Sequence, residues 1–157
     1  MATLGNPLPS CGTRPKVSII TPAFNARAFV RPMLVSASRQ TFGDFEHLVV
    51  DDGSSDETAA IAEEFAATDP RVRVIRQRNR GASAARNAAI EQAAGDYFAL
   101  LDADDVWMPD FLAAQLAILA AHPDVDIVSA NAINLGGPFD GRPLKPTSAA
   151  CTRLSLL

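Results

Sequence analysis

The sequence predicts an α/β fold with a mostly parallel sheet that is covered by helices on both faces. Short apolar runs rich in β-branched residues alternate with alanine-rich stretches of helical length. The short runs are apolar on both faces, which is typical of parallel strands because crossover helices pack on both faces of such a sheet. With 157 residues and 48% hydrophobic content, the chain can bury one core of ordinary size.

The elements follow a leader, residues 1–16, whose Pro, Gly and polar residues predict disorder. The expected strands are 17–21, 46–51, 72–76, 97–102 and 126–131. The expected helices are 29–40, 57–67, 83–94 and 109–121, and Ser54 and Glu57 have the spacing of a capping box before the second helix. Residues 135–157 lack periodicity and predict an irregular tail, so the expected ordered domain spans residues 17–134.

Charge and hydropathy exclude several classes of protein. The net charge of -4 and the absence of a basic run argue against binding to nucleic acid or to an anionic membrane surface. The longest apolar stretch, residues 111–121, is far shorter than a membrane-spanning helix. The N-terminus does not resemble a secretory signal. The expected location is the cytoplasm, including peripheral attachment at the inner face of the membrane.

Three polar clusters directly follow expected strands: TPAFN (21–25), DDGSSD (51–56) and DADD (102–105). The carboxyl ends of parallel strands share one edge of the sheet, where ligands bind, so we expect the clusters to converge. Turn chemistry alone explains a single cluster of this kind. Several carboxylates at one edge with no matching lysines repel one another, however, unless a cation or a ligand donor relieves them.

Asp102 and Asp104 flank one residue, and alternate strand positions point the same way. Two such carboxylates suit Mg²⁺ or Mn²⁺, which completes its shell with water and substrate phosphates. A D-x-D pair alone is weak evidence, and its position after an apolar strand strengthens it. Residues 79–87 open a helix after a glycine, where N–H groups and the Arg86 guanidinium can face phosphate oxygens. The alternative is that Arg86 is a solvated helix residue.

Four motifs occur in order: TPAFNA (21–26), VDDGSSDET (50–58), NRGASAARNAAI (79–90) and LLDADDVWMPDFL (100–112). Together they resemble the donor domain of family 2 glycosyltransferases, which have the GT-A fold. The resemblance extends over residues 16–131. Four motifs in order are specific, whereas DDGS or D-x-D alone is not.

The resemblance implies a base pocket and a phosphate site. The base pocket would be lined by Thr21, Pro22 and Ala23, with Asn25 in the same nucleotide-sugar-binding set. Asp52 would accept a hydrogen bond from the base, commonly uracil in this family.

On the phosphate side, Arg86 would contact the nucleotide near its base or phosphates. Asp102 would hold the ribose or help to bind the metal, and Asp104 would be the main metal ligand at the diphosphate. Asp51 and Asp105 are second-rank candidates.

The family transfers a sugar from a nucleotide-diphosphate donor with inversion, and a carboxylate removes the proton of the acceptor hydroxyl. A UDP-sugar donor, a saccharide or lipid-linked acceptor, and a role in cell wall or polysaccharide biosynthesis are implied. The family's general base lies well downstream of D-x-D, so none is identified in this chain. Among the later acidic residues, Asp140 comes nearest to a suitable context for that role. We therefore expect a truncated chain without the acceptor region, whose own activity is open.

Truncation would also expose apolar side chains of the helix at 109–121 and favour self-association. The side chains concerned are Phe111, Leu112, Leu116, Ile118 and Leu119. The alternative function is a non-catalytic nucleotide-sugar-binding module or an inert remnant. A phospho-acceptor signalling domain fits less well, since Ser129 and Lys145 have the wrong order and context, and no G-x-G-x-x-G supports a dinucleotide site.

Overall fold

A computed structural model describes residues 14–134 and 140–143 of the chain. Most of the predicted leader (1–16) and of the predicted tail (135–157) lies outside these ranges. The chain divides into two compact units, one that ends at Phe111 and one that begins at Leu112, and each is described by itself.

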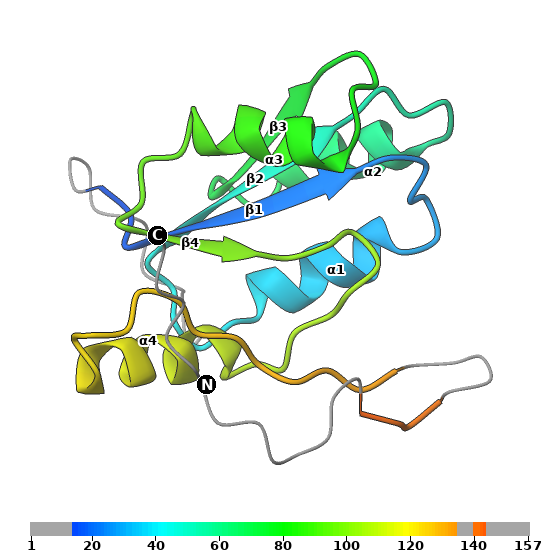
Figure 1. Cartoon of the computed structure of the whole chain (residues 1–157). Helices are drawn as coiled ribbons and strands as arrows, with labels where there is room; N and C mark the ends of the chain where they lie inside the picture. The colour runs from blue at the N-terminus through cyan, green and yellow to red at the C-terminus, as the bar shows by residue number, and fades with distance from the viewer. Residues whose placement is uncertain (1–13, 135–139, 144–157) are drawn as a thin grey trace, which may run out of the picture. The chain divides into compact units, whose positions relative to one another are not determined.

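The first unit contains a four-stranded sheet in which every pairing is parallel (Figure 1). Its strands are β1 (Val17–Ala23), β2 (Phe45–Asp51), β3 (Val72–Arg76) and β4 (Tyr97–Leu100), in the order β3-β2-β1-β4 across the sheet. The first four predicted strands are therefore confirmed to within a few residues. Because all four run the same way, their carboxyl ends lie at one edge.

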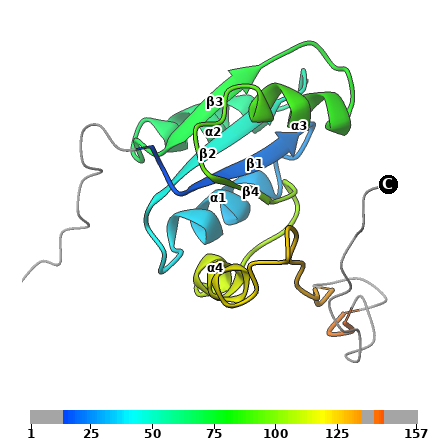
Figure 2. The ribbon, with the colours of Figure 1, turned by 60° about the vertical axis from the view of Figure 1, so that its left-hand side comes forward.

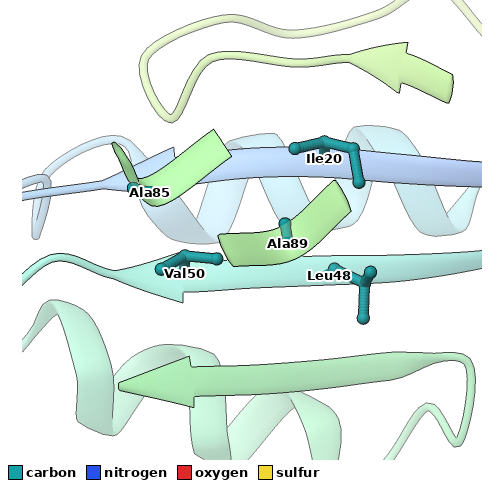
Figure 3. Packing of buried hydrophobic residues seen from close by; sticks show 5 residues of the cluster. All are labelled: Ile20, Leu48, Val50, Ala85 and Ala89. Carbon is teal, nitrogen blue, oxygen red and sulfur yellow. The ribbon is translucent and has the colours of Figure 1, made fainter. Parts of the chain in front are cut away.

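Three helices cover this sheet: α1 (Val30–Ser38), α2 (Thr58–Ala66) and α3 (Ala82–Ile90). In Figure 1, α3 lies in front of the sheet, and the view turned by 60° in Figure 2 shows α1 and α3 on opposite sides of β1. Close by, the α1 and α2 ribbons lie behind the strands that α3 covers from the front (Figure 3). This two-sided cover confirms the prediction and explains why β1 and β2 are apolar on both faces.

The core beneath α3 joins the two central strands to the helix. Ile20 of β1 and Leu48 and Val50 of β2 pack against Ala85 and Ala89 of α3, and all five are fully buried (Figure 3). The two alanines are four residues apart and share one face of the helix. Their methyl groups let the helix backbone approach the sheet closely, so the alanine-rich sequence of α3 is a packing feature.

A polar network at the amino-terminal edge of the sheet fixes β4 beside β1. The Ser18 hydroxyl donates to Glu46 Oε1 at 2.7 Å and accepts the Gly95 N–H at 2.8 Å. The Ala94 N–H donates to the same Glu46 oxygen at 2.6 Å. A Cβ atom at Gly95 would lie 2.5 Å from the backbone nitrogen of Ser18, so only glycine fits there without a shift of the backbone.

The second unit contains α4 (Phe111–Ala121) from its second residue onward, and the sequence of this helix, FLAAQLAILAA, is apolar on all sides except at Gln115. No helix of the described residues is long and apolar enough to cross a membrane. In α4 the structure exposes 41% of Ile118 but only 2% of Leu112. The expectation of an exposed apolar side chain is therefore confirmed for Ile118 and wrong for Leu112, while self-association stays a prediction.

The predicted strand at residues 126–131 is wrong, because these residues adopt no strand conformation. An isolated antiparallel bridge joins Ile133 to Pro143 nearby. A short apolar run becomes a strand only where a neighbouring strand takes up its ladder hydrogen bonds. Within the described ranges no strand does so for residues 126–131.

Candidate functional site

The loops that follow the strands meet at the carboxyl-terminal edge of the sheet. The Asp52 N–H, just after β2, donates to the Ala23 carbonyl at the end of β1 at 2.8 Å. On the other side of β1, the Leu101 N–H donates to the Ile20 carbonyl at 3.1 Å. The predicted convergence of the three polar clusters on one edge is confirmed.

Side chains of the β2–α2 loop and of the first residue of α2 accept hydrogen bonds from the backbone that follows β1. Three successive N–H groups donate at 3.0, 2.8 and 3.2 Å to side-chain oxygens, and the pairs are Asn25 with Ser54, Ala26 with Thr58, and Arg27 with Asp56. Asn25 has a φ of 49°, and its Oδ1 accepts the Ser55 N–H at 2.8 Å. Asn25 therefore bridges two loops of the site, and its amide oxygen is engaged within the protein.

The same contacts overturn the predicted capping box. The Ser54 hydroxyl accepts the Asn25 N–H, and α2 begins at Thr58 after Glu57, with no side-chain hydrogen bond at the cap. The spacing in the sequence suits a cap, but the Ser54 hydroxyl accepts a hydrogen bond from a residue 29 positions away instead. A contact between two loops therefore replaces the local cap.

Asp52 is buried and joins the loop after β2 to the loop after β3. Its Oδ1 accepts from Gln77 Nε2 at 2.6 Å and from the Arg80 N–H at 2.9 Å, and its Oδ2 accepts the Gly81 N–H at 2.8 Å. Burial alone would raise the pKa of Asp52, but these three hydrogen bonds and the positive charge of Arg80 together outweigh it and lower the pKa below its usual value. Asp52 is therefore ionised and held in place at neutral pH.

The predicted base-pocket residues of β1 differ in exposure. Pro22 is half-buried and Ala23 is buried, while Thr21 is fully buried with its hydroxyl 2.9 Å from His47 Nε2. Burial lowers the pKa of His47 to about 3, so its ring is neutral at pH 7. The Thr21 hydroxyl is thus engaged below the edge of the sheet.

The acidic loop after β4 contains one paired and two exposed aspartates. Asp102 Oδ1 lies 2.5 Å from Arg86 Nη2 of α3, so these two predicted site residues are brought together. Asp104 and Asp105 are exposed. Partial burial, together with the nearby charges of Asp104 and Asp102, raises the pKa of Asp105. The carboxylates of this loop therefore repel one another, as their sequence spacing indicated.

We tested whether these residues suit a divalent cation. In the described part of the chain, no group of three or more His, Cys, Asp or Glu side chains is placed to hold a metal ion. Mg²⁺ sites commonly use one or two carboxylates and complete their shell with water and substrate phosphates. A cation at Asp102 and Asp104 would therefore depend on water and phosphate oxygens to complete its shell, and the role of these two residues as metal ligands stays a prediction.

Two residues at this edge were not singled out from the sequence. Gln77 donates to Asp52, and its position just after β3 was the only available signal. Phe24, which lies within the predicted cluster at 21–25, follows β1 with 51% of its surface exposed. An exposed aromatic ring beside a polar cluster offers a flat apolar surface to a ligand.

Comparison with known proteins decides the family. The pattern of the family named Glycosyl transferase family 2 matches residues 18–154. The chain belongs to glycosyltransferase family 2. It is 40% identical over 114 residues to the uncharacterized glycosyltransferase EpsJ of Bacillus subtilis, covering 73% of this chain and 33% of EpsJ. It is 38% identical over 104 residues to the Escherichia coli UDP-Glc:alpha-D-GlcNAc-diphosphoundecaprenol beta-1,3-glucosyltransferase WfgD, covering 66% of this chain and 40% of WfgD.

Two solved structures share the fold of this family 2 chain. S. aureus TarS 1-349 in complex with UDP has a TM-score of 0.64 at 30% identity and covers 69% of this chain. The mannosyltransferase PcManGT from Pyrobaculum calidifontis, in complex with GDP-Man and Mn²⁺, gives the same three values. The GT-A fold implied by the resemblance is thus confirmed. The chain spans about a third of the length of each of these two proteins.

Proposed function

We propose that this chain binds a nucleotide-diphosphate sugar, with a UDP-sugar as its donor, and forms the donor side of an inverting, metal-dependent glycosyltransferase. The observation that carries the proposal is the convergence on one edge of the sheet of the anchored Asp52, the Arg86–Asp102 pair and the exposed Asp104. One edge thereby offers a hydrogen-bond acceptor for a base and a cation-binding group for a diphosphate. Membership of family 2 supports this reading.

The base would bind between Asp52 and Phe24. A carboxylate has about four lone-pair positions, and three hydrogen bonds to Asp52 leave room for one further donor, such as the ring N–H of uracil. The exposed ring of Phe24 can stack on the base. Thr21 would contribute through its backbone, because its hydroxyl faces His47.

The diphosphate would bind near Arg86, Asp102 and Asp104. The planar guanidinium of Arg86 matches paired phosphate oxygens, and Asp104 with Asp102 would hold Mg²⁺ or Mn²⁺. When bound, the cation supplies Lewis-acid stabilisation of the leaving nucleoside diphosphate. The PcManGT structure in complex with GDP-Man and Mn²⁺ supports a cation. The UDP complex of TarS contains a different base, so both nucleotides belong in the test.

In this proposal the acceptor is a saccharide or a lipid-linked hydroxyl, as the name of WfgD states for that enzyme. The reaction takes place in the cytoplasm, including the inner face of the membrane. No carboxylate of the site is assigned as the base that removes the acceptor proton. Binding without transfer is therefore the alternative function, and release of UDP from UDP-sugars in the presence of saccharide acceptors separates the two.

Calorimetric titration with UDP and with GDP, each with and without Mn²⁺, tests donor binding. We expect UDP to bind in the presence of Mn²⁺ and Asp104→Ala to weaken binding by about tenfold or more, the scale for loss of a charged partner. Asp96→Ala is the matched control, because Asp96 is an exposed aspartate paired with Lys16 away from the site. A folded wild-type chain that binds neither nucleotide would refute the proposal.

A further inference from the structure

Arg86 and Asp102 are partners of each other within the proposed site. Arg86 belongs to α3 and Asp102 to the loop after β4, and their contact joins Nη2 to Oδ1 at 2.5 Å. Their side chains are 30% and 49% exposed, so solutes can reach the pair. Each residue also has a second predicted partner, since phosphate suits Arg86 and a divalent cation suits Asp102.

The pair does not use all the hydrogen-bonding capacity of Arg86. Its Nε is buried and has no hydrogen-bond partner among the described residues. A guanidinium presents five N–H donors in a rigid fork that matches two oxygens of a phosphate. Because an unsatisfied buried donor costs free energy, a ligand that also reaches Nε would satisfy a donor that the contact to Asp102 leaves unpaired.

The pair also hinders a cation at Asp102. The loop carries three aspartates, at positions 102, 104 and 105, and one of them pairs with the Arg86 guanidinium, so the formal charge of this group is -2 at neutral pH. That charge attracts a divalent cation to the loop. At Asp102 itself, however, the cation meets the like charge of Arg86, which occupies Oδ1 of the carboxylate.

We propose that Arg86 exchanges partners: a divalent cation displaces it from Asp102, and the freed guanidinium then binds the diphosphate of the donor. This inference rests on the proposed function. The exchange couples the two ligands, because each removes an obstacle to the other. The coupling is reciprocal, so breaking the ion pair from either side strengthens the binding of one ligand in the absence of the other.

Two single variants test the exchange, each through a gain of affinity. Arg86→Gln should bind Mn²⁺ alone about fivefold more tightly than wild type, since nothing competes for Asp102. Asp102→Asn should bind UDP in EDTA about fivefold more tightly, since Arg86 is free for phosphate. Both values lie at the low end of usual coupling strengths. The double variant should bind Mn²⁺ less tightly than Arg86→Gln does, because it lacks the Asp102 carboxylate to which the cation binds.

Matched controls are Arg31→Gln and Asp96→Asn, which remove one partner each from surface pairs outside the site. Neither should change either affinity. A misfolded variant cannot produce a gain, and each arm is informative without the other. If Arg86→Gln binds Mn²⁺ no more tightly than wild type, or Asp102→Asn binds UDP no more tightly, the exchange is wrong. The proposed donor site is unaffected by either result. If folded wild type with Mn²⁺ binds neither UDP nor GDP, the proposed function and the exchange are both wrong.

Discussion

At the amino-terminal edge of the sheet, Glu46 is shielded from solvent and its Oε1 accepts hydrogen bonds from Ser18 and Ala94. At the carboxyl-terminal edge, Asp102 shares one short contact with Arg86, and Asp104 stands exposed beside it. Both edges carry acidic residues close to strand ends. At the first edge, hydrogen bonds within the protein satisfy the network, and Gly95 packs closely against it. At the second edge, negative charge is left unmatched, and Arg86 Nε has no hydrogen-bond partner among the described residues.

This difference separates polar residues that stabilise the fold from polar residues that are suited to a ligand. A satisfied, shielded carboxylate contributes to the position of its neighbours, because removing it leaves buried donors unpaired. A carboxylate that stays exposed near like charges contributes little to folding and is free to bind a cation. Variants at the amino-terminal edge should therefore change stability, and variants at the carboxyl-terminal edge should change ligand affinity.

The largest effect on stability is expected from Gly95→Ala. The added Cβ would lie 2.5 Å from the Ser18 backbone nitrogen, so β1 and the turn before β4 must separate. We expect a loss of about 3 kcal/mol in the free energy of unfolding, at the upper end for overpacking, measured by urea denaturation. Gly43→Ala is the control, because nothing lies within 4 Å of its Cβ position. Equal stability of the two variants would contradict the description of the amino-terminal edge as closely packed.

Asp52→Asn tests the exception at the carboxyl-terminal edge, where three hydrogen bonds within the protein hold one carboxylate. It should cost about 2 kcal/mol, because hydrogen bonds to a charged group are lost and one amide donor would face backbone N–H groups. The hydrogen bonds lower the pKa of Asp52, so its contribution is present above the unfolded value of 3.8 and is lost as pH falls through the lower folded value. The stability difference between wild type and Asp52→Asn should shrink below about pH 4. A difference that stays constant from pH 7 to pH 3 would contradict this assignment.

How far the sequence predicts this molecule depends on the range of each contact. Alternating apolar runs and helical stretches were enough for β1 to β4 and for the convergence of their loops, because parallel strands place those loops at one edge. The pairing of Arg86 with Asp102 was not predictable, since it depends on how α3 packs over the sheet. The capping role of Ser54 failed for the same reason, and residues 126–131 had strand propensity without a neighbouring strand.

His47 lies in β2 and hydrogen-bonds Thr21 beneath the carboxyl-terminal edge. Burial lowers its pKa to about 3 from 6.5, so the unfolded chain binds a proton that the folded chain does not. Stability should fall as pH drops below 6.5, by up to about 1.4 kcal/mol per pH unit between pH 6 and pH 5. His47→Gln should remove this slope, and His122→Gln, at an exposed position, should retain it. An unchanged slope in His47→Gln would assign the proton to another group.

The smallest effect is expected from Arg73→Gln, which is the counterpart of Arg86→Gln at the opposite edge. Arg73 Nη1 lies 3.6 Å from Glu46 Oε2 and its side chain is 50% exposed, so solvent screens the pair. Because the hydrogen bonds from Ser18 and Ala94 hold Glu46 independently, we expect a loss of only about 0.5 kcal/mol in chemical denaturation and no change in Mn²⁺ or UDP affinity. The same substitution would then alter ligand binding at one edge and almost nothing at the other. A loss above about 2 kcal/mol would mean that the buried charge of Glu46 is stabilised mainly by Arg73. The ion pair, rather than the hydrogen bonds from Ser18 and Ala94, would then stabilise the amino-terminal edge.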